Sequence, residues 1–190
     1  MKHRKLPYDP VPFWTEEGRT YYDRHRRTEA FKEQEEALID VLSVRLSTED
    51  RLPLVLEAGC GFGRIADLLY STFGDLYYLG FDLSYEQICR AQELVPMNRA
   101  TFLRKTIDDF EEVEHGFDLV LAVEVLMHVK PEDLERTVDK LRSFGPLITV
   151  DWTEPVEGPI DNHNFLHDYE ALGLRPIRKV GLQTIYSSEG

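Results

Sequence analysis

The sequence predicts an α/β domain built on a doubly wound, mostly parallel sheet of seven strands with an antiparallel strand at one edge. From residue 52 onward, short apolar runs alternate with amphipathic stretches, a pattern typical of parallel strands joined by helices. Residues 119–123 are apolar at every position, as expected for a strand buried on both faces. The last two apolar runs are joined tightly at Gly181, which predicts an antiparallel pair.

The expected elements follow one another in a regular order. Apolar residues at three- and four-residue steps predict an amphipathic helix at 28–46. Ser84, with Gln87 three residues later, forms the pattern of a capping box, and Pro131 followed by two acidic residues is typical of a first helical turn. We expect strands at 52–56, 76–81, 100–104, 117–123, 147–150, 174–180 and 182–186, and helices at 28–46, 64–73, 84–94, 131–143 and near 165–172.

The N-terminal segment, residues 6–27, combines three prolines with large aromatic residues such as Trp14, Tyr21 and Tyr22. This composition suits neither a long regular element nor disorder. We therefore expect the segment to pack onto the rest of the chain, which at 190 residues is long enough for one domain. A polar loop rich in proline and glycine is expected at 153–162.

Composition narrows the class of protein. No apolar run approaches the roughly 20 residues that a membrane span needs, and no apolar segment follows the N-terminal charges. We therefore expect a cytoplasmic protein with no membrane partner. Two cysteines, Cys60 and Cys89, disfavour a disulfide scaffold or a thiolate metal site, and we expect no metal. The net charge of −13 disfavours a nucleic-acid partner, although residues 1–27 carry a local +3 that we interpret as a solvated arm.

Glycine and acidic residues gather where the first strands are expected to end. In an open α/β sheet, ligands bind outside the carboxyl ends of the strands, where the strand order reverses. Gly59, Gly61 and Gly63 let the backbone turn sharply and approach a ligand. Asp82, which ends the second strand, is placed to accept hydrogen bonds from both hydroxyls of a ribose. Residues 61–66 also satisfy the dinucleotide pattern G-x-G-x-x-G/A, so the turn alone admits a nicotinamide cofactor as well.

The residues around the turn distinguish the possible cofactors. The stretch VLEAGCGFG at 55–63 resembles the first motif, E/D-x-G-x-G-x-G, of class I S-adenosylmethionine-dependent methyltransferases. LGFDLS at 79–84 resembles their ribose-binding second strand, and TIDDF at 106–110 resembles their adenine-contacting loop. FDLVLAVEVLMHV at 117–129 is similar to the fourth-strand motif of the small-molecule branch, which includes ubiquinone and menaquinone biosynthesis methyltransferases. The resemblance covers roughly residues 50–151 and implies a Rossmann-like fold.

The resemblance implies a single domain whose consecutive segments have different functions. Residues 1–50 would form an N-terminal helical lid, 51–151 the cofactor-binding core, and 152–190 a substrate loop and a C-terminal strand pair. The glycine turn with Glu57 would hold the methionine portion, Asp82 the ribose, and residues 107–109 with Leu83 the adenine end. The cofactor-binding residues expected in this way are Glu57, Gly59, Cys60, Gly61, Phe62, Gly63, Asp82, Leu83, Ile107, Asp108, Asp109 and Val123.

Candidates for the acceptor side come from the fourth strand and from the segments outside the motifs. His128 follows the fourth strand near the expected methyl position and could titrate near neutrality, so it is a candidate base; packing at the helix entrance is the alternative. Glu124 is the second catalytic candidate, with a helix cap or loop acceptor as its alternative. The expected substrate-binding residues are Tyr21, Tyr22, Asp151, His163 and His167.

The cofactor implies the reaction. A sulfonium makes the methyl group electrophilic, so we expect an in-line displacement in which alignment and exclusion of water supply much of the acceleration. We expect an enzyme that moves the methyl group of S-adenosylmethionine to an oxygen or nitrogen atom of a small-molecule acceptor and leaves S-adenosylhomocysteine. The alternatives are a methyltransferase acting on protein or RNA, a non-catalytic S-adenosylmethionine-binding subunit, and a nicotinamide-dependent reductase, for which the sequence lacks a Tyr-x-x-x-Lys pair.

Overall fold

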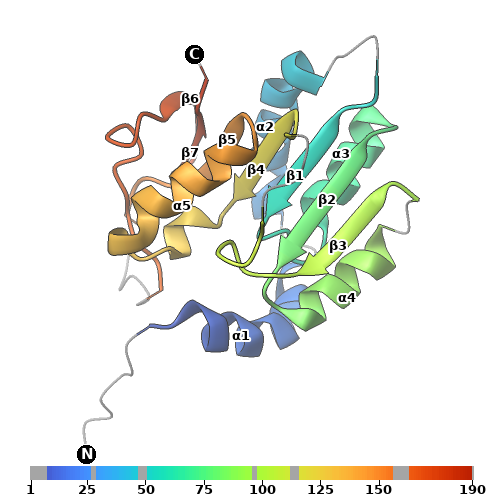
Figure 1. The fold of residues 1–190 in the computed structure, drawn as a ribbon, viewed down its shortest axis with the longest axis horizontal. Helices are drawn as coiled ribbons and strands as arrows, with labels where there is room; N and C mark the ends of the chain where they lie inside the picture. Colours follow the sequence, from blue (N-terminus) through green and yellow to red (C-terminus); the bar gives the residue numbers. More distant parts are fainter. Residues whose placement is uncertain are drawn as a thin grey trace, which may run out of the picture.

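A computed structural model describes residues 8–26, 29–46, 51–95, 98–111, 116–155 and 163–189. Strands and helices alternate through most of the chain (Figure 1), as the sequence predicts. The elements are α1 (Pro10–His25), α2 (Ala30–Leu46), β1 (Leu54–Ala58), α3 (Arg64–Phe73), β2 (Tyr77–Asp82), α4 (Tyr85–Leu94), β3 (Ala100–Arg104), β4 (Leu119–Val123), the 3-10 turn η1 (Leu126–His128), α5 (Pro131–Phe144), β5 (Leu147–Trp152), β6 (Arg175–Val180) and β7 (Gln183–Ser187).

The sheet contains seven strands in the order β3-β2-β1-β4-β5-β7-β6. The first five are parallel to one another, and β7 runs antiparallel between β5 and β6. The doubly wound, mostly parallel sheet with an antiparallel element at this end is thereby confirmed. The strand order reverses between the parallel neighbours β1 and β4, and the helices that follow them, α3 and α5, lie on opposite faces of the sheet, which leaves a crevice at the carboxyl ends of the two strands.

Each face of the sheet is covered by its own helices. Buried side chains of α2, α3 and α4 pack with inward-facing residues such as Val55 and Leu119 in one apolar cluster. On the opposite face, α5 and the segment around Tyr169 pack with Leu56 and Val120 in a second cluster. Neighbouring residues of one strand thus serve different clusters, and this alternation explains why the central strands are apolar throughout.

The expectation that residues 6–27 form no long regular element is wrong, because α1 is a helix of 16 residues. Asp9 caps its N-terminus by accepting a hydrogen bond from the backbone N–H of Val11, and Pro10 occupies the first turn, where a missing N–H costs nothing. The prolines therefore start the helix. Four basic residues of the N-terminal arm, Lys2, Arg4, Lys5 and Arg27, lie outside the described residues.

The short helix expected near 165–172 is also wrong. Residues 164–168 have no regular secondary structure and 169–173 form turns. The backbone N–H of Phe165 donates to the carbonyl of Met127 instead of to its own segment, and three overlapping turn hydrogen bonds within 169–174 end at Leu172, Gly173 and Leu174. The start of this segment is therefore held by η1, the turn that follows β4, and not by the hydrogen bonds of a helix. Of the loop expected at 153–162, residues 156–162 lie outside the described residues.

Candidate active site

A cavity of about 530 Å³ opens at the carboxyl ends of the central strands. Its walls come from the glycine turn after β1, the end of β2, the loop after β3, the residues that follow β4 and the start of α5. Helix α1 lies across the ends of the strands (Figure 1) and contributes Trp14, Gly18 and Tyr21 to the lining. The chain thus encloses a site between the sheet and an N-terminal helix.

The glycine turn is shaped for close approach of a ligand. Gly59, Gly61 and Gly63 have φ values of +67°, +51° and +84°, which glycine adopts without strain. A Cβ on Gly61 would find only the Oε1 atom of Gln87 within 4 Å, at 3.9 Å, so it would project into the cavity. A substituent at position 61 would therefore fill space that a ligand can occupy.

Two acidic residues flank this turn. Asp82 accepts hydrogen bonds from the backbone N–H groups of Gly61 (3.0 Å) and Ser84 (2.8 Å), so its carboxylate is fixed beside the cavity. Glu57 is only 2% exposed, accepts a hydrogen bond from the hydroxyl of Tyr78, and has its pKa raised to about 7 by burial. Both carboxyl groups line the cavity, and Asp82 offers oxygen atoms toward a hydroxylated ligand.

Glu124 follows β4 and belongs to a network of side chains from four elements. Its backbone has a φ of +57°, a conformation rarely adopted by glutamate. Its carboxylate accepts from Nε2 of Gln183 at 2.6 Å and lies 3.8 Å from the guanidinium of Arg64. Arg64 also contacts Glu35 and Gln34, each at 2.8 Å, and Gln34 donates to Gln183. Arg64 lines the cavity and was not among the expected site residues; its signal is its position directly after Gly63.

His128 ends η1 and lines the cavity on the side of α1. Its Nδ1 lies 3.0 Å from the carbonyl oxygen of His163, and its ring contacts that of Trp14, with centroids 4.6 Å apart. Because a carbonyl can only accept, Nδ1 carries the proton and the lone pair of the neutral ring is on Nε2. Burial lowers the pKa of His128 to about 4. The expectation that His128 titrates near neutrality is therefore corrected: it is neutral at physiological pH.

Comparison with known proteins accounts for this arrangement. Residues 55–144 match the sequence profile of a family described as a methyltransferase domain. These residues form a methyltransferase domain. The predicted resemblance to methyltransferases is thereby confirmed for these residues. A search of curated proteins finds no match to the chain.

Solved structures share this fold over 73–95% of the chain. Magnesium protoporphyrin IX methyltransferase (ChlM) from Synechocystis PCC 6803, with bound SAM, has a TM-score of 0.70 at 19% identity, over 95% of this chain and 96% of that one. The DhpI–SAH complex has a TM-score of 0.65 at 18% identity, over 93% and 92%. The plantazolicin methyltransferase BpumL has a TM-score of 0.58 at 17% identity, over 73% of this chain and 53% of that one.

Most of the expected cofactor-binding residues of the methyltransferase domain line the cavity. The loop after β3 is ordered by Thr106 and Asp109, whose side chains bond at 2.7 Å, and Asp108 is paired with Arg136 of α5. Gly63 alone of the expected set does not line the cavity; it forms the N-cap of α3. The expected residues in the lining are Glu57, Gly59, Cys60, Gly61, Phe62, Asp82, Leu83, Ile107, Asp108, Asp109 and Val123, together with Tyr21, Glu124 and His128.

Four of the expected substrate-binding residues do not line the cavity. Tyr22 packs edge-on against Phe62, and His163 meets His128 both through its backbone carbonyl and through its ring, which stacks on the imidazole of His128 with centroids 5.4 Å apart. Nε2 of His167 lies 3.1 and 3.0 Å from the carbonyl oxygens of Leu126 and Val129, so it ties down the two ends of η1. These contacts make His163 and His167 supports of the site.

Asp151 is the fourth residue outside the cavity. It is fully buried at the end of β5, accepts a hydrogen bond from the N–H of Met127 at 3.0 Å, and contacts the hydroxyl of Thr149. Burial raises its pKa to about 7. Asp151 therefore holds η1 in place from the side away from the cavity, and so fixes the position of His128. Among the described residues, no group of side chains could hold a metal ion, and no helix has the length and apolar character needed to cross a membrane.

Proposed function

We propose that the chain binds S-adenosylmethionine in the cavity and transfers its methyl group to an oxygen or nitrogen atom of a small-molecule acceptor by in-line displacement. The observation that carries the proposal is the continuity of the cavity, which runs from the glycine turn and Asp82 to His128 and α1. One end suits a nucleoside with a charged tail, and the other leaves room for a second reactant. The family of residues 55–144 supports the same reaction.

The cofactor end fits the group that this family uses. The open space over Gly61 is a cradle that any side chain would fill, and Asp82 presents fixed carboxylate oxygens beside it. We assign the ribose to Asp82, the methionine portion to Glu57 and the glycine turn, and the adenine end to Leu83 and residues 107–109. Solved complexes of the same fold contain SAM or SAH, which supports this assignment.

The acceptor end lies between His128 and α1. When bound, S-adenosylmethionine supplies an electrophilic methyl group on a sulfonium. The neutral imidazole of His128 accepts a hydrogen bond from an O–H or N–H of the acceptor at Nε2 and so orients the nucleophile. A pKa of about 4 makes His128 a weak base, which favours orientation over full proton removal in its role. Helix α1, with Trp14 and Tyr21 on the cavity, excludes water.

A small acceptor agrees with the enclosure of the site by α1 and with one structural neighbour, a magnesium protoporphyrin IX methyltransferase. The net charge of −13 disfavours a nucleic-acid acceptor. A peptide acceptor would have to insert a narrow side chain into the cavity, because α1 covers the ends of the strands. Turnover assays with small molecules and with peptides distinguish these two classes.

The test of the proposal compares ligands by thermal shift. S-adenosylmethionine and S-adenosylhomocysteine should stabilise the protein by about 2.7 kcal/mol at 100 times their dissociation constants, and NAD(H) should have no effect. Asp82→Ala should lose most of the S-adenosylhomocysteine response while the free protein remains folded, with a melting temperature lowered by the loss of the hydrogen bonds from Gly61 and Ser84. Stabilisation by NAD(H) alone would refute the proposal, and an unchanged response in Asp82→Ala would refute the ribose assignment.

A further inference from the structure

Gln87, in the first turn of α4, has one unsatisfied end inside the cavity. Its side chain is 4% exposed, and its Oε1 accepts no hydrogen bond from any residue that the structure describes. Gln87 lines the cavity, and Oε1 faces the glycine turn, 3.9 Å from where a Cβ of Gly61 would stand. A buried acceptor without a donor is costly, so this atom indicates a donor that a ligand supplies.

The other end of the same amide holds α1. Nε2 of Gln87 donates to the backbone carbonyl of Gly18 in the middle of that helix. The capping box expected from Ser84 is therefore only half formed: Ser84 accepts from the N–H of Gln87, but the N–H of Ser84 donates to Asp82. The side chain of Gln87 is thus available to bridge two elements that are far apart in the sequence.

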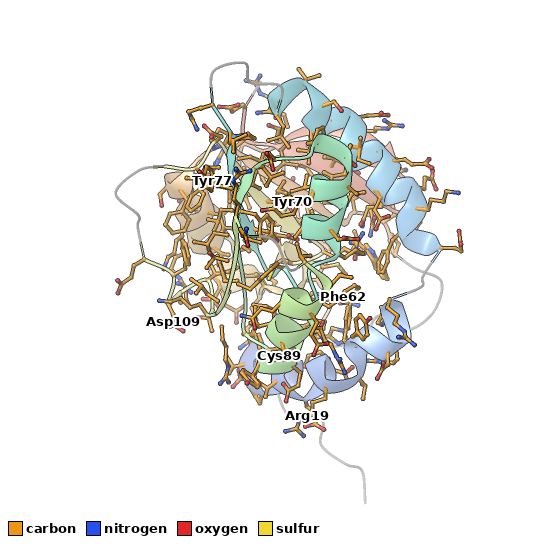
Figure 2. All side chains as sticks on the ribbon, turned by 90° about the vertical axis from the view of Figure 1, so that its right-hand side faces the viewer. Arg19, Phe62, Tyr70, Tyr77, Cys89 and Asp109 are labelled. Atoms are coloured by element: carbon orange, nitrogen blue, oxygen red, sulfur yellow. The ribbon has the colours of Figure 1, made fainter. Side chains whose placement is uncertain are left out.

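Gly18 lets α1 and α4 touch directly. A Cβ at position 18 would lie 2.0 Å from the Oγ of Ser84, a separation that no side chain tolerates. Figure 2 shows this contact region at one end of the molecule, with Arg19 on α1, Cys89 on α4 and Phe62 of the glycine turn close by. The position of α1 over the cavity therefore depends on its contact with the start of α4.

We propose that Gln87 couples the occupied cofactor site to the closure of α1. Its Oε1 accepts a hydrogen bond from a hydroxyl group of the cofactor's ribose, while its Nε2 keeps α1 in place through Gly18. The inference rests on the proposed function, which puts the ribose at Asp82, five residues before Gln87. Since the amide is planar, a ligand that fixes one end also fixes the other.

Coupling of this kind is reciprocal. If the ligand holds the amide in the orientation that binds Gly18, it lowers the frequency with which α1 leaves the cavity. By the same amount, a docked α1 strengthens ligand binding, because the free energy of coupling is shared by both sites. Opening of α1 is then favoured only after the ribose has left Oε1, so the acceptor site stays closed to water while the cofactor is present.

The test compares Gln87→Met with Gln92→Met, an exposed glutamine on the same helix. Both changes keep helix propensity and side-chain length, so loss of folding is a poor explanation for a difference between them. Gln87→Met should weaken S-adenosylhomocysteine binding about tenfold by calorimetry, and Gln92→Met should not. In the wild type, S-adenosylhomocysteine should slow amide exchange in α1; in Gln87→Met this added protection should disappear.

Deoxy analogues of S-adenosylhomocysteine identify the bond. In the wild type, an analogue that lacks the 2′-hydroxyl and one that lacks the 3′-hydroxyl should each bind more weakly than S-adenosylhomocysteine itself. In Gln87→Met, one of the two analogues should bind as tightly as S-adenosylhomocysteine, because the partner of the missing hydroxyl is already gone. Gly18→Ala, which forces α1 off α4, should also reduce affinity although it adds no group that contacts the ribose. Equal affinities of Gln87→Met and wild type, or losses from both analogues that are the same in the two proteins, would overturn the coupling. If the wild type binds no S-adenosylhomocysteine at all, the proposed function itself fails.

Discussion

Asp151→Asn should make the protein more stable at alkaline pH. In the wild type the carboxyl group is fully buried, and its pKa is raised to about 7 mainly by burial. The hydroxyl of Thr149 donates to the carbonyl of Ala122 at 2.8 Å, so a protonated Asp151 can donate to the Thr149 oxygen in turn. Asparagine keeps both this donor and the acceptor for the N–H of Met127. The change therefore removes a titration and preserves the contacts.

The magnitude follows from proton linkage. The pKa of Asp151 is raised from 3.8 to about 7 on folding. A raised carboxyl pKa means that the native state binds more protons between these values, so stability falls as pH rises from about 4 to about 7. At 1.36 kcal/mol for each pH unit, this loss amounts to at most about 4 kcal/mol. The advantage of Asp151→Asn should be near zero at pH 4 and approach that value at pH 8.

Urea denaturation at pH 5, 6, 7 and 8 measures this difference. Asp139→Asn, an exposed change on α5, provides the matched control and should track the wild type at every pH. Glu57, whose pKa is also raised to about 7, titrates in all three proteins and cancels from the comparison. If the difference between Asp151→Asn and wild type is the same at pH 5 and pH 8, Asp151 is not protonated in the folded protein and the reasoning is refuted.

Three further changes test the site itself. Gly61→Ala should abolish S-adenosylhomocysteine binding by calorimetry, because its Cβ enters the cavity. The positive φ at this position should also lower the free energy of unfolding by about 1 kcal/mol. Binding as tight as in the wild type would show that the ligand does not occupy the space over Gly61. His128→Asn should keep its affinity for S-adenosylhomocysteine and lose turnover. If turnover is retained, His128 does not orient the acceptor and its role is packing alone. Since the pKa of His128 is lowered to about 4, its imidazole signals in an NMR titration of the wild type should show no protonation between pH 5.5 and 8, and a midpoint near pH 6.5 would contradict that.

The part of the fold that sequence predicts well is the part encoded by local patterns. Continuous apolar runs give the central strands to within about two residues, and the position of Pro131 gives the start of α5. Two segments were misjudged for opposite reasons. In α1 the prolines were interpreted as interruptions although Asp9 and Pro10 begin a helix. At 165–172 we expected a helix, but the backbone N–H of Phe165 donates to Met127 of η1 and residues 169–173 form turns.

The site divides in the same way. The glycine turn and Asp82 lie in short motifs whose spacing fixes their geometry, so they could be located from sequence. The partners of Glu124 could not, because the network joins Gln34 to Gln183 across 149 residues of chain. Asp151 was expected at the cavity but is buried outside its lining, because a strand's carboxyl end holds both cavity residues and the buried residues behind them, and the sequence does not distinguish the two.

A crystal structure of the protein with S-adenosylhomocysteine tests the central claim most directly. We predict electron density in the cavity over Gly61, with the ribose within hydrogen-bond distance of Asp82 and the sulfur on the side of His128 and α1. Density for the nucleoside elsewhere, or a ribose that makes no contact with Asp82, would contradict the account.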